Sequence, residues 1–143
     1  LTLSKVLSQL GAKSILKAIK KISKGEEKFQ EQNHDQATYA KKILKEEGHI
    51  NWSQSAKMIL AKINGLNPNP GAWFEYHKQR YKVLKAKIVN KNGDFGKTLD
   101  DNLTIACKEQ AIKVLEIQKA GKNKQTIDQF LLGNKIKQGE SFN

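Results

Sequence analysis

Residues 81–89 read Tyr81-Lys82-Val83-Leu84-Lys85-Ala86-Lys87-Ile88-Val89, and their pattern decides the fold class of the chain. Leu84, Ala86 and Ile88 alternate with Lys85 and Lys87, so in an extended strand the two sets point to opposite faces. This period of two residues is typical of a strand with one buried face. The stretch therefore predicts a half-buried β-strand whose outer face carries lysine, together with Tyr81.

Four more short segments near this strand have the pattern and composition of β-strands. They comprise residues 72–76, 96–99, 103–107 and 111–118. Five short strands with hairpin-length connections are the number found in a small OB-type barrel. We therefore predict an α+β fold, in which a small OB-type five-stranded β-barrel has flanking helices.

Two amphipathic segments predict the helices that flank the barrel. The first is capped by Ser53 or Gln54 and ends at Gly65, before a proline-rich turn that cannot continue a helix. The second covers residues 126–132, and Thr126 is its predicted N-cap.

The beginning of the chain has a different organisation. Apolar residues recur at helical spacing over residues 3–24, with an interruption at Gly11 that predicts a helix pair or one kinked helix. Residues 25–50 are polar and without a clean period, as in a surface linker. The sequence thus predicts three parts: a helical segment (1–24), a linker (25–50) and a barrel domain (51–143).

Composition points to a polyanionic partner. The 143 residues include 26 Lys and Arg against 14 Asp and Glu, a net charge of +12, which favours nucleic acid or an anionic membrane surface. Arg80 is the one arginine, and lysine suits phosphates better than base edges. The sequence shows no membrane span, no signal peptide and a single cysteine, Cys107, which we expect to be buried. We expect a cytoplasmic chain, and a fragment of something longer because it begins with Leu1.

The basic residues fall in clusters along the sequence. Residues 78–91 contain six of them and no acidic residue, and further clusters occur in the linker and near the end of the chain. A strand face of this kind can lie along a phosphate backbone, although lysines on small sheets also serve to resist aggregation. The candidate nucleic-acid-binding residues are Lys41, Lys42, Lys45, Lys78, Arg80, Lys82, Lys85, Lys87, Lys122 and Lys124.

The sequence provides no candidate catalytic, cofactor-binding or metal-binding residues. His34, His49 and His77 are far apart and lack partners at metal-ligand spacing. The stretch from Gly121 to Lys124 lacks the earlier glycine and the hydroxyl residue of a phosphate-binding loop. A stand-alone basic barrel that binds nucleic acid or a protein, without enzyme activity, is therefore one reading of the chain.

Several sequence motifs, which occur in the same order as in a known family, favour another interpretation of the chain. The first group comprises Ala37-Thr38-Tyr39-Ala40-Lys41-Lys42-Ile43, Lys45-Glu46-Glu47, Ile50-Asn51-Trp52 and Asn67-Pro68-Asn69-Pro70-Gly71-Ala72. The second comprises Leu115-Glu116-Ile117-Gln118-Lys119-Ala120-Gly121-Lys122 and Asp128-Gln129-Phe130-Leu131-Leu132-Gly133. Together they resemble the linker and C-terminal domain of bacterial methionyl-tRNA formyltransferases.

The resemblance implies an enzyme of translation initiation. Members of this family are transferases that move a formyl group from 10-formyltetrahydrofolate to the amino group of methionyl initiator tRNA, a one-carbon transfer. The family's C-terminal domain is an OB-type barrel that helps to hold the tRNA. The family's catalytic residues have no counterpart here, which implies that this fragment alone is inactive.

The resemblance also gives residues 1–24 a role, as the last helices of an otherwise absent catalytic domain. Their apolar stripe, at Leu7, Leu10, Ile15 and Ile19, then needs a cover in the fragment, and a dimer would supply one. The full-length parent is expected to be a monomer with no metal and no membrane partner.

Overall fold

The computed structural model describes residues 2–142, which divide into two compact units with the boundary between Ala40 and Lys41. The first unit contains helix α1 (Thr2–Ile22) and a short 3-10 turn, η1 (His34–Gln36). α1 is one helix that continues through Gly11, so the predicted interruption there is wrong. The three-part division of the sequence at 24/25 and 50/51 remains a prediction.

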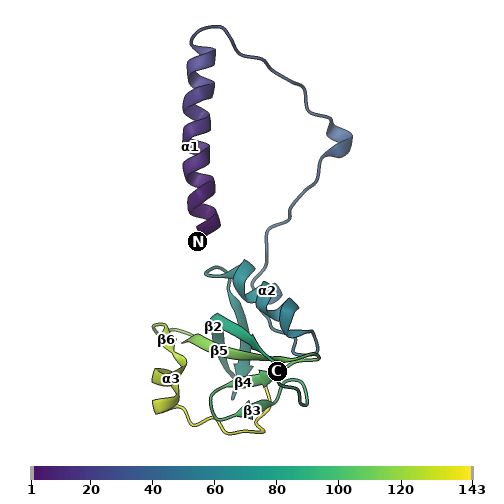
Figure 1. The fold of residues 1–143 in the computed structure, drawn as a ribbon, viewed down its shortest axis with the longest axis vertical. Helices are drawn as coiled ribbons and strands as arrows, with labels where there is room; N and C mark the ends of the chain where they lie inside the picture. Colours follow the sequence, from purple (N-terminus) through teal and green to yellow (C-terminus); the bar gives the residue numbers. More distant parts are fainter. Residues whose placement is uncertain (1, 143) are drawn as a thin grey trace. The chain divides into compact units, whose positions relative to one another are not determined.

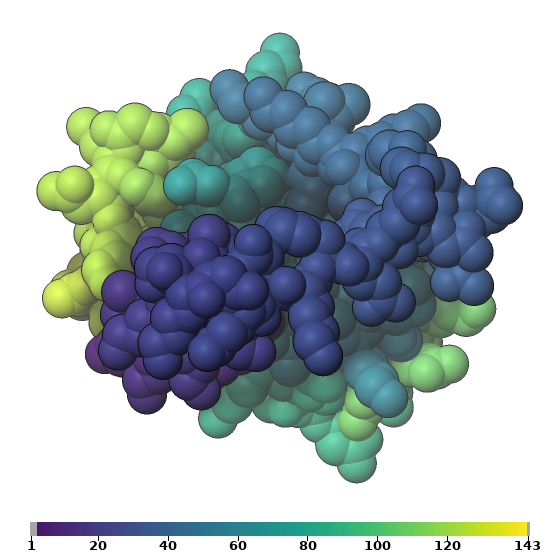
Figure 2. Space-filling view, turned by 90° about the horizontal axis from the view of Figure 1, so that it is seen from above, coloured from purple at the N-terminus to yellow at the C-terminus, as the bar shows by residue number. Residues whose placement is uncertain are grey.

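The apolar stripe of α1 is open to solvent within this unit. Leu7, Leu10, Ile15 and Ile19 are each more than half exposed. In the space-filling view the helix is seen nearly end-on, in purple, with side chains projecting around it (Figure 2). The charged face of the helix carries Lys13, Lys17 and Lys20, as an amphipathic pattern requires.

The second unit is built around an antiparallel sheet (Figure 1). Its main strands are β1 (Ala72–Tyr76), β2 (Gln79–Val89), β3 (Thr98–Asp100), β4 (Thr104–Ala106) and β5 (Ala111–Lys119). Their spatial order is β1-β2-β5-β4-β3, and the short β6 (Gln125–Thr126) pairs with β5. The α+β class is therefore confirmed, with β1 matching the predicted strand at residues 72–76.

The sheet curls but does not close into a barrel among the described strands. β1 and β3 stand at opposite ends of the strand order and do not pair with each other. Each free edge is partly covered by another segment of the same chain. His49 forms an isolated β-bridge with Trp73 of β1, and Lys97, beside β3, forms one with Ser141. Covering an edge in this way protects its backbone groups without closure. The observed architecture is a half-barrel, and the closed OB-type five-stranded barrel is not confirmed.

Helix α2 (Ala56–Leu66) packs Ala56, Ile59 and Ile63 into the core of the second unit. Its N-cap is Ser55, whose Oγ accepts from the Met58 amide at 3.4 Å. The predicted caps, Ser53 and Gln54, are wrong because the preceding residues form a turn of their own.

In that turn, the Asn51 carboxamide oxygen accepts from both the Ser53 amide, at 3.0 Å, and the Ser53 hydroxyl, at 2.7 Å. The Ser53 side chain is thus already engaged, and the helix begins later. At the other end α2 is followed by the turn at residues 67–71, which contains two cis X-Pro bonds.

The core of the second unit is rich in aromatic rings. Phe74 packs edge-on against Phe142, with ring centroids 5.1 Å apart, and Tyr81 packs edge-on against Phe130 of helix α3 (Ile127–Gly133) at 5.5 Å. Thr126 caps α3 through a capping box with Gln129, so the predicted cap is confirmed. Among the residues described, no helix combines the length and the apolarity that crossing a membrane requires.

Candidate nucleic-acid interface

A pair of irregularities in the sheet brings the basic residues of β2 onto one face. The β2–β5 pairing shifts register on both sides of Lys85, which leaves Leu84 on β2 and Leu115 on β5 without partners. An extra residue of this kind exchanges the two faces of a strand. Tyr81 and Val83 therefore point into the core before the bulge, and Ala86 and Ile88 pack against it afterwards.

Between Arg80 and Lys87 the outward side chains of β2 are consequently all basic apart from the half-buried Leu84. They are Arg80, Lys82, Lys85 and Lys87, which we call the basic face. Strict alternation would have split this set, because Lys85 and Lys87 would lie opposite Arg80 and Lys82. The prediction that Tyr81 lies on the outer face is wrong for the same reason: it is 5% exposed, and burial raises its pKa.

Arg80 lies over the ring of a tryptophan. Its guanidinium carbon lies 3.7 Å from the centroid of the Trp73 ring, in cation–π geometry. Trp73 is on β1, where its backbone partner across the ladder is Lys82, while Arg80 is opposite Glu75. This contact restricts the position of the guanidinium and leaves its N–H groups free to bind oxygen atoms.

The Trp73 ring is fixed by the first residues of the second unit. Its indole N–H donates to the Lys45 carbonyl at 2.9 Å, and its own carbonyl accepts from the Ile50 amide at 2.8 Å. This close approach depends on Gly48, because a Cβ there would clash with the Gly71 carbonyl and touch the Trp73 ring. Lys45 is thereby brought beside the basic face, although 35 residues separate it from Arg80 in the sequence.

Two shallow hollows flank Arg80 and Lys82, and both residues line both hollows. The first, about 250 Å³, is completed by Lys45, Trp73 and the turn at residues 69–70. The second, about 200 Å³, is completed by the end of β5, including Lys119. Four basic side chains therefore surround two concave places on the surface of one sheet.

The other predicted binding residues lie around this centre or apart from it. Lys78 is in the two-residue turn between β1 and β2, where it has a φ of 60°. Lys122 lies in the turn after β5, tied to the sheet by the Gln118 side-chain amide, which donates to its carbonyl at 2.8 Å. Lys41, Lys42 and Lys124 are exposed on segments that the hollows do not include.

The predicted basic residues are free of intramolecular ion pairs within residues 2–142. The ion pairs of this part of the chain use Lys91, Lys97 and Lys137. Glu75 and Glu116 are the acidic residues that pair across the ladder with Arg80 and Lys85, and neither lies in a salt bridge of the described part. The basic face thus keeps its charge for an external partner.

Sequence reasoning missed two members of this site. Trp73 was missed, although the alternation of Ala72 and Phe74 with Trp73 and Glu75 could have placed it outward. Lys119, a member of the basic cluster near the end of the chain, is not among the predicted candidates, and only the β2–β5 pairing brings it next to Arg80. The contact between Trp73 and Lys45 has no local signal in the sequence.

The described residues offer no reactive thiol. Cys107 is buried, as predicted, and this burial raises the pKa of its thiol to about 11. No group of three or more His, Cys, Asp or Glu side chains within residues 2–142 is arranged to hold a metal ion.

Comparison with known proteins agrees with the motifs. A family model described as "Formyl transferase, C-terminal domain" matches residues 42–135. The methionyl-tRNA formyltransferase of Pelagibacter ubique is 44% identical over 139 residues, which are 96% of this chain and 45% of that protein. The methionyl-tRNA formyltransferase of Neisseria gonorrhoeae is 37% identical over 137 residues, 93% of this chain and 44% of that protein. The chain spans less than half the length of these curated relatives.

A solved structure shares the fold. The crystal structure of HypX from Aquifex aeolicus in complex with tetrahydrofolic acid matches with a TM-score of 0.67 and 18% identity, over 82% of this chain and 22% of that one. The resemblance of the sequence motifs to methionyl-tRNA formyltransferases is confirmed by relatives that carry that name. Because the family model covers more than half of the sequence, the chain belongs to the formyl transferase C-terminal domain family.

Proposed function

We propose that this chain is the tRNA-binding C-terminal part of a methionyl-tRNA formyltransferase of the cytoplasm. The parent enzyme would transfer a formyl group from 10-formyltetrahydrofolate to the amino group of methionyl initiator tRNA. The support is that relatives of that name match nearly the whole chain at 37–44% identity. Their length beyond the matched region leaves room for the catalytic part.

The observation that carries the tRNA-binding role is the basic face with its two flanking hollows. Phosphate contacts dominate the affinity of proteins for nucleic acid, and they need basic side chains whose charge is not already neutralised by an ion pair. Arg80, stacked on Trp73, and Lys82 meet this need, with Lys45 and Lys119 beside them. The proposal treats the half-barrel as an OB-type fold, a class whose sheet surfaces bind oligonucleotides.

The chemistry of formyl transfer is assigned to the part of the relatives that this chain does not span. No nucleophile with a general base is found among residues 2–142, and Cys107 is buried. In this proposal residues 1–24, which contain the single helix α1, are the end of the catalytic domain, and residues 25–50 link it to the tRNA-binding domain. The exposed stripe of α1 packs on that domain in the parent, and a dimer can cover it in the isolated chain.

Two assays on the purified 143-residue chain test the proposal. We expect it to bind initiator tRNA with an affinity that falls steeply as salt rises, and to give no formylation of methionyl-tRNA above a no-protein control. The rival, a protein-interaction module whose charge serves only solubility, predicts no tRNA binding at low salt. Absence of binding, or formylation by the chain alone, would refute the proposal.

A further inference from the structure

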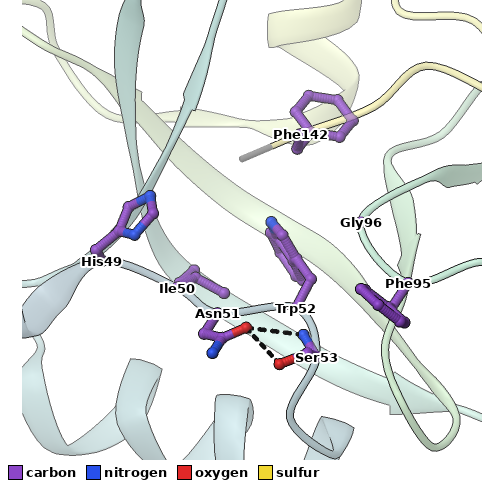
Figure 3. Close-up of a pocket in the computed structure, with 8 residues that line it drawn as sticks. All are labelled: His49, Ile50, Asn51, Trp52, Ser53, Phe95, Gly96 and Phe142. Carbon is purple, nitrogen blue, oxygen red and sulfur yellow. Dashed lines mark hydrogen bonds between the residues drawn. The ribbon is translucent and has the colours of Figure 1, made fainter.

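A third hollow of the second unit lies where aromatic side chains from three parts of the chain meet (Figure 3). Its volume is about 330 Å³, roughly ten times the ~30 Å³ that a water molecule occupies in the liquid, so it has room for a planar ring. Residues 49–53 line one side, and Phe95, Gly96 and Phe142 complete it. Phe95 is 60% exposed, so its ring is accessible to a ligand in the hollow.

The wall of this hollow contains a buried hydrogen-bond donor without an acceptor. Trp52 is 3% exposed, and its indole N–H has no partner among the described residues. In Figure 3 the indole nitrogen lies at the end of the ring toward Phe142, between His49 and Phe95. A buried N–H that makes no hydrogen bond costs about 1–3 kcal/mol. The donor is itself buried, so an acceptor from outside reaches it only when a side chain that lines the hollow moves aside.

The hollow adjoins the basic face through the contact between His49 and Trp73. His49 lines the hollow, and its ring centroid lies 4.5 Å from that of Trp73. The same Trp73 ring carries the Arg80 guanidinium. Only the side chains of Trp73 and His49 therefore lie between a polyanion bound at Arg80 and the hollow.

We propose that this hollow binds one unstacked nucleobase of an RNA whose phosphates lie on the basic face. Trp52 Nε1 donates to an in-plane acceptor atom of the base, and Phe95 and His49 offer aromatic surfaces for stacking. Proteins recognise single-stranded RNA by this combination of stacking and edge contacts. Since every RNA base carries an in-plane acceptor, the indole donor alone does not select among them. The inference rests on the proposed tRNA-binding function.

The test observes the donor itself. The chain has two tryptophans, Trp52 and Trp73, so the protein labelled with ¹⁵N gives two indole signals, which the Trp52→Phe variant assigns. The probes are a short oligocytidylate and a ribose-phosphate oligomer of equal length that lacks bases. We expect oligocytidylate to move the Trp52 indole signal downfield and to slow its exchange with solvent. The oligomer without bases should bind through its phosphates and leave this signal in place.

Affinities of variants give a second readout. Phe95→Ala should weaken oligocytidylate binding at least fivefold, because stacking of a base on an aromatic ring contributes about 1–3 kcal/mol. Trp52→Phe keeps an aromatic ring and removes the N–H, and should weaken binding roughly fivefold. Phe29→Ala is the matched control, since Phe29 is 88% exposed in the other unit and should have no effect. Thermal melting identifies any variant that fails to fold, and the Phe95 variant is the one expected to melt normally.

The outcomes separate this inference from the function on which it rests. If saturating oligocytidylate leaves the Trp52 signal unmoved, or if both oligomers move it equally, the hollow holds no base and the inference is wrong, while tRNA binding stands. If a protein segment rather than RNA moves the signal, the inference is equally overturned. If neither oligomer nor tRNA binds at low salt, the proposed function itself fails.

Discussion

Replacing both Lys85 and Lys87 by alanine tests whether the basic face contacts phosphates. Both side chains are exposed on the outward face of β2, beyond the bulge, and neither is in an ion pair of the described residues. The substitutions should therefore leave the free energy of unfolding within about 0.5 kcal/mol of wild type, as surface changes usually do.

The expected loss of tRNA affinity depends on salt in a way that can be calculated. Each phosphate contact contributes about 0.9 to the slope of log affinity against log salt on a duplex, so two lost contacts reduce the slope by roughly 1.8. Between 50 and 200 mM salt, a fourfold change, the advantage of wild type over the variant should shrink about tenfold. Because a lysine that contacts a phosphate does not distinguish one base sequence from another, the variant should lose the same factor of affinity for initiator and elongator tRNAs.

Filter binding or fluorescence anisotropy over a salt series provides the measurement. The matched control is Lys108→Ala with Lys135→Ala, which removes two exposed positive charges from loops away from the basic face. A general effect of net charge would lower the slope equally in both double variants. If the Lys85 and Lys87 variant melts normally and keeps the wild-type affinity and slope, phosphates do not contact this part of β2.

Three other outcomes are expected. Arg80→Lys keeps the positive charge but loses the stack of the guanidinium on Trp73. Fluorescence anisotropy should therefore show roughly fivefold weaker tRNA binding with an unchanged salt slope. An unchanged affinity would mean that the stack is irrelevant to binding. Limited trypsin digestion should cut first at Lys41 and Lys42, on exposed chain without secondary structure, and primary cuts within β2 or β5 would contradict the predicted linker. The hydrogen bond that Tyr76 donates to Glu140 lowers the pKa of the Glu140 carboxyl. The pair therefore stabilises the fold at pH values above the ordinary carboxyl pKa of 4.5, and this contribution is lost as the pH falls through the lowered pKa. The urea midpoint of the Glu140→Gln variant should consequently fall less on acidification than that of wild type, and Glu109→Gln is the control.

Local sequence patterns predict much of the fold correctly. The predicted strand at residues 72–76 is β1, and the predicted cap Thr126 does begin α3, because alternation and capping depend on neighbours within a few residues. The ten candidate basic residues were predicted from their clustering along the sequence, and four of them lie on the basic face of β2.

What the sequence could not provide depends on contacts between distant residues. Tyr81 was assigned to the wrong face because strict alternation, extended backwards from Lys85, ignores the bulge at Leu84. The stack of Arg80 on Trp73 and the bond from Trp73 to Lys45 join parts of the chain that only the folded sheet brings together. The orphaned donor of Trp52 is likewise visible only once its surroundings are known.

The paired irregularity in β2 and β5 also limits how this domain can change in length. Leu84 and Leu115 are extra residues on neighbouring strands, and the ladder keeps the same register on either side of them. Deleting Leu84 alone would leave Leu115 unmatched and force one strand to slip, which would turn core residues outward. Deleting both would give a regular ladder in which Arg80, Lys82, Lys85 and Lys87 still share a face. Insertions and deletions in these two strands are therefore tolerated in pairs, so a lineage that loses one of the two leucines is expected to have lost the other.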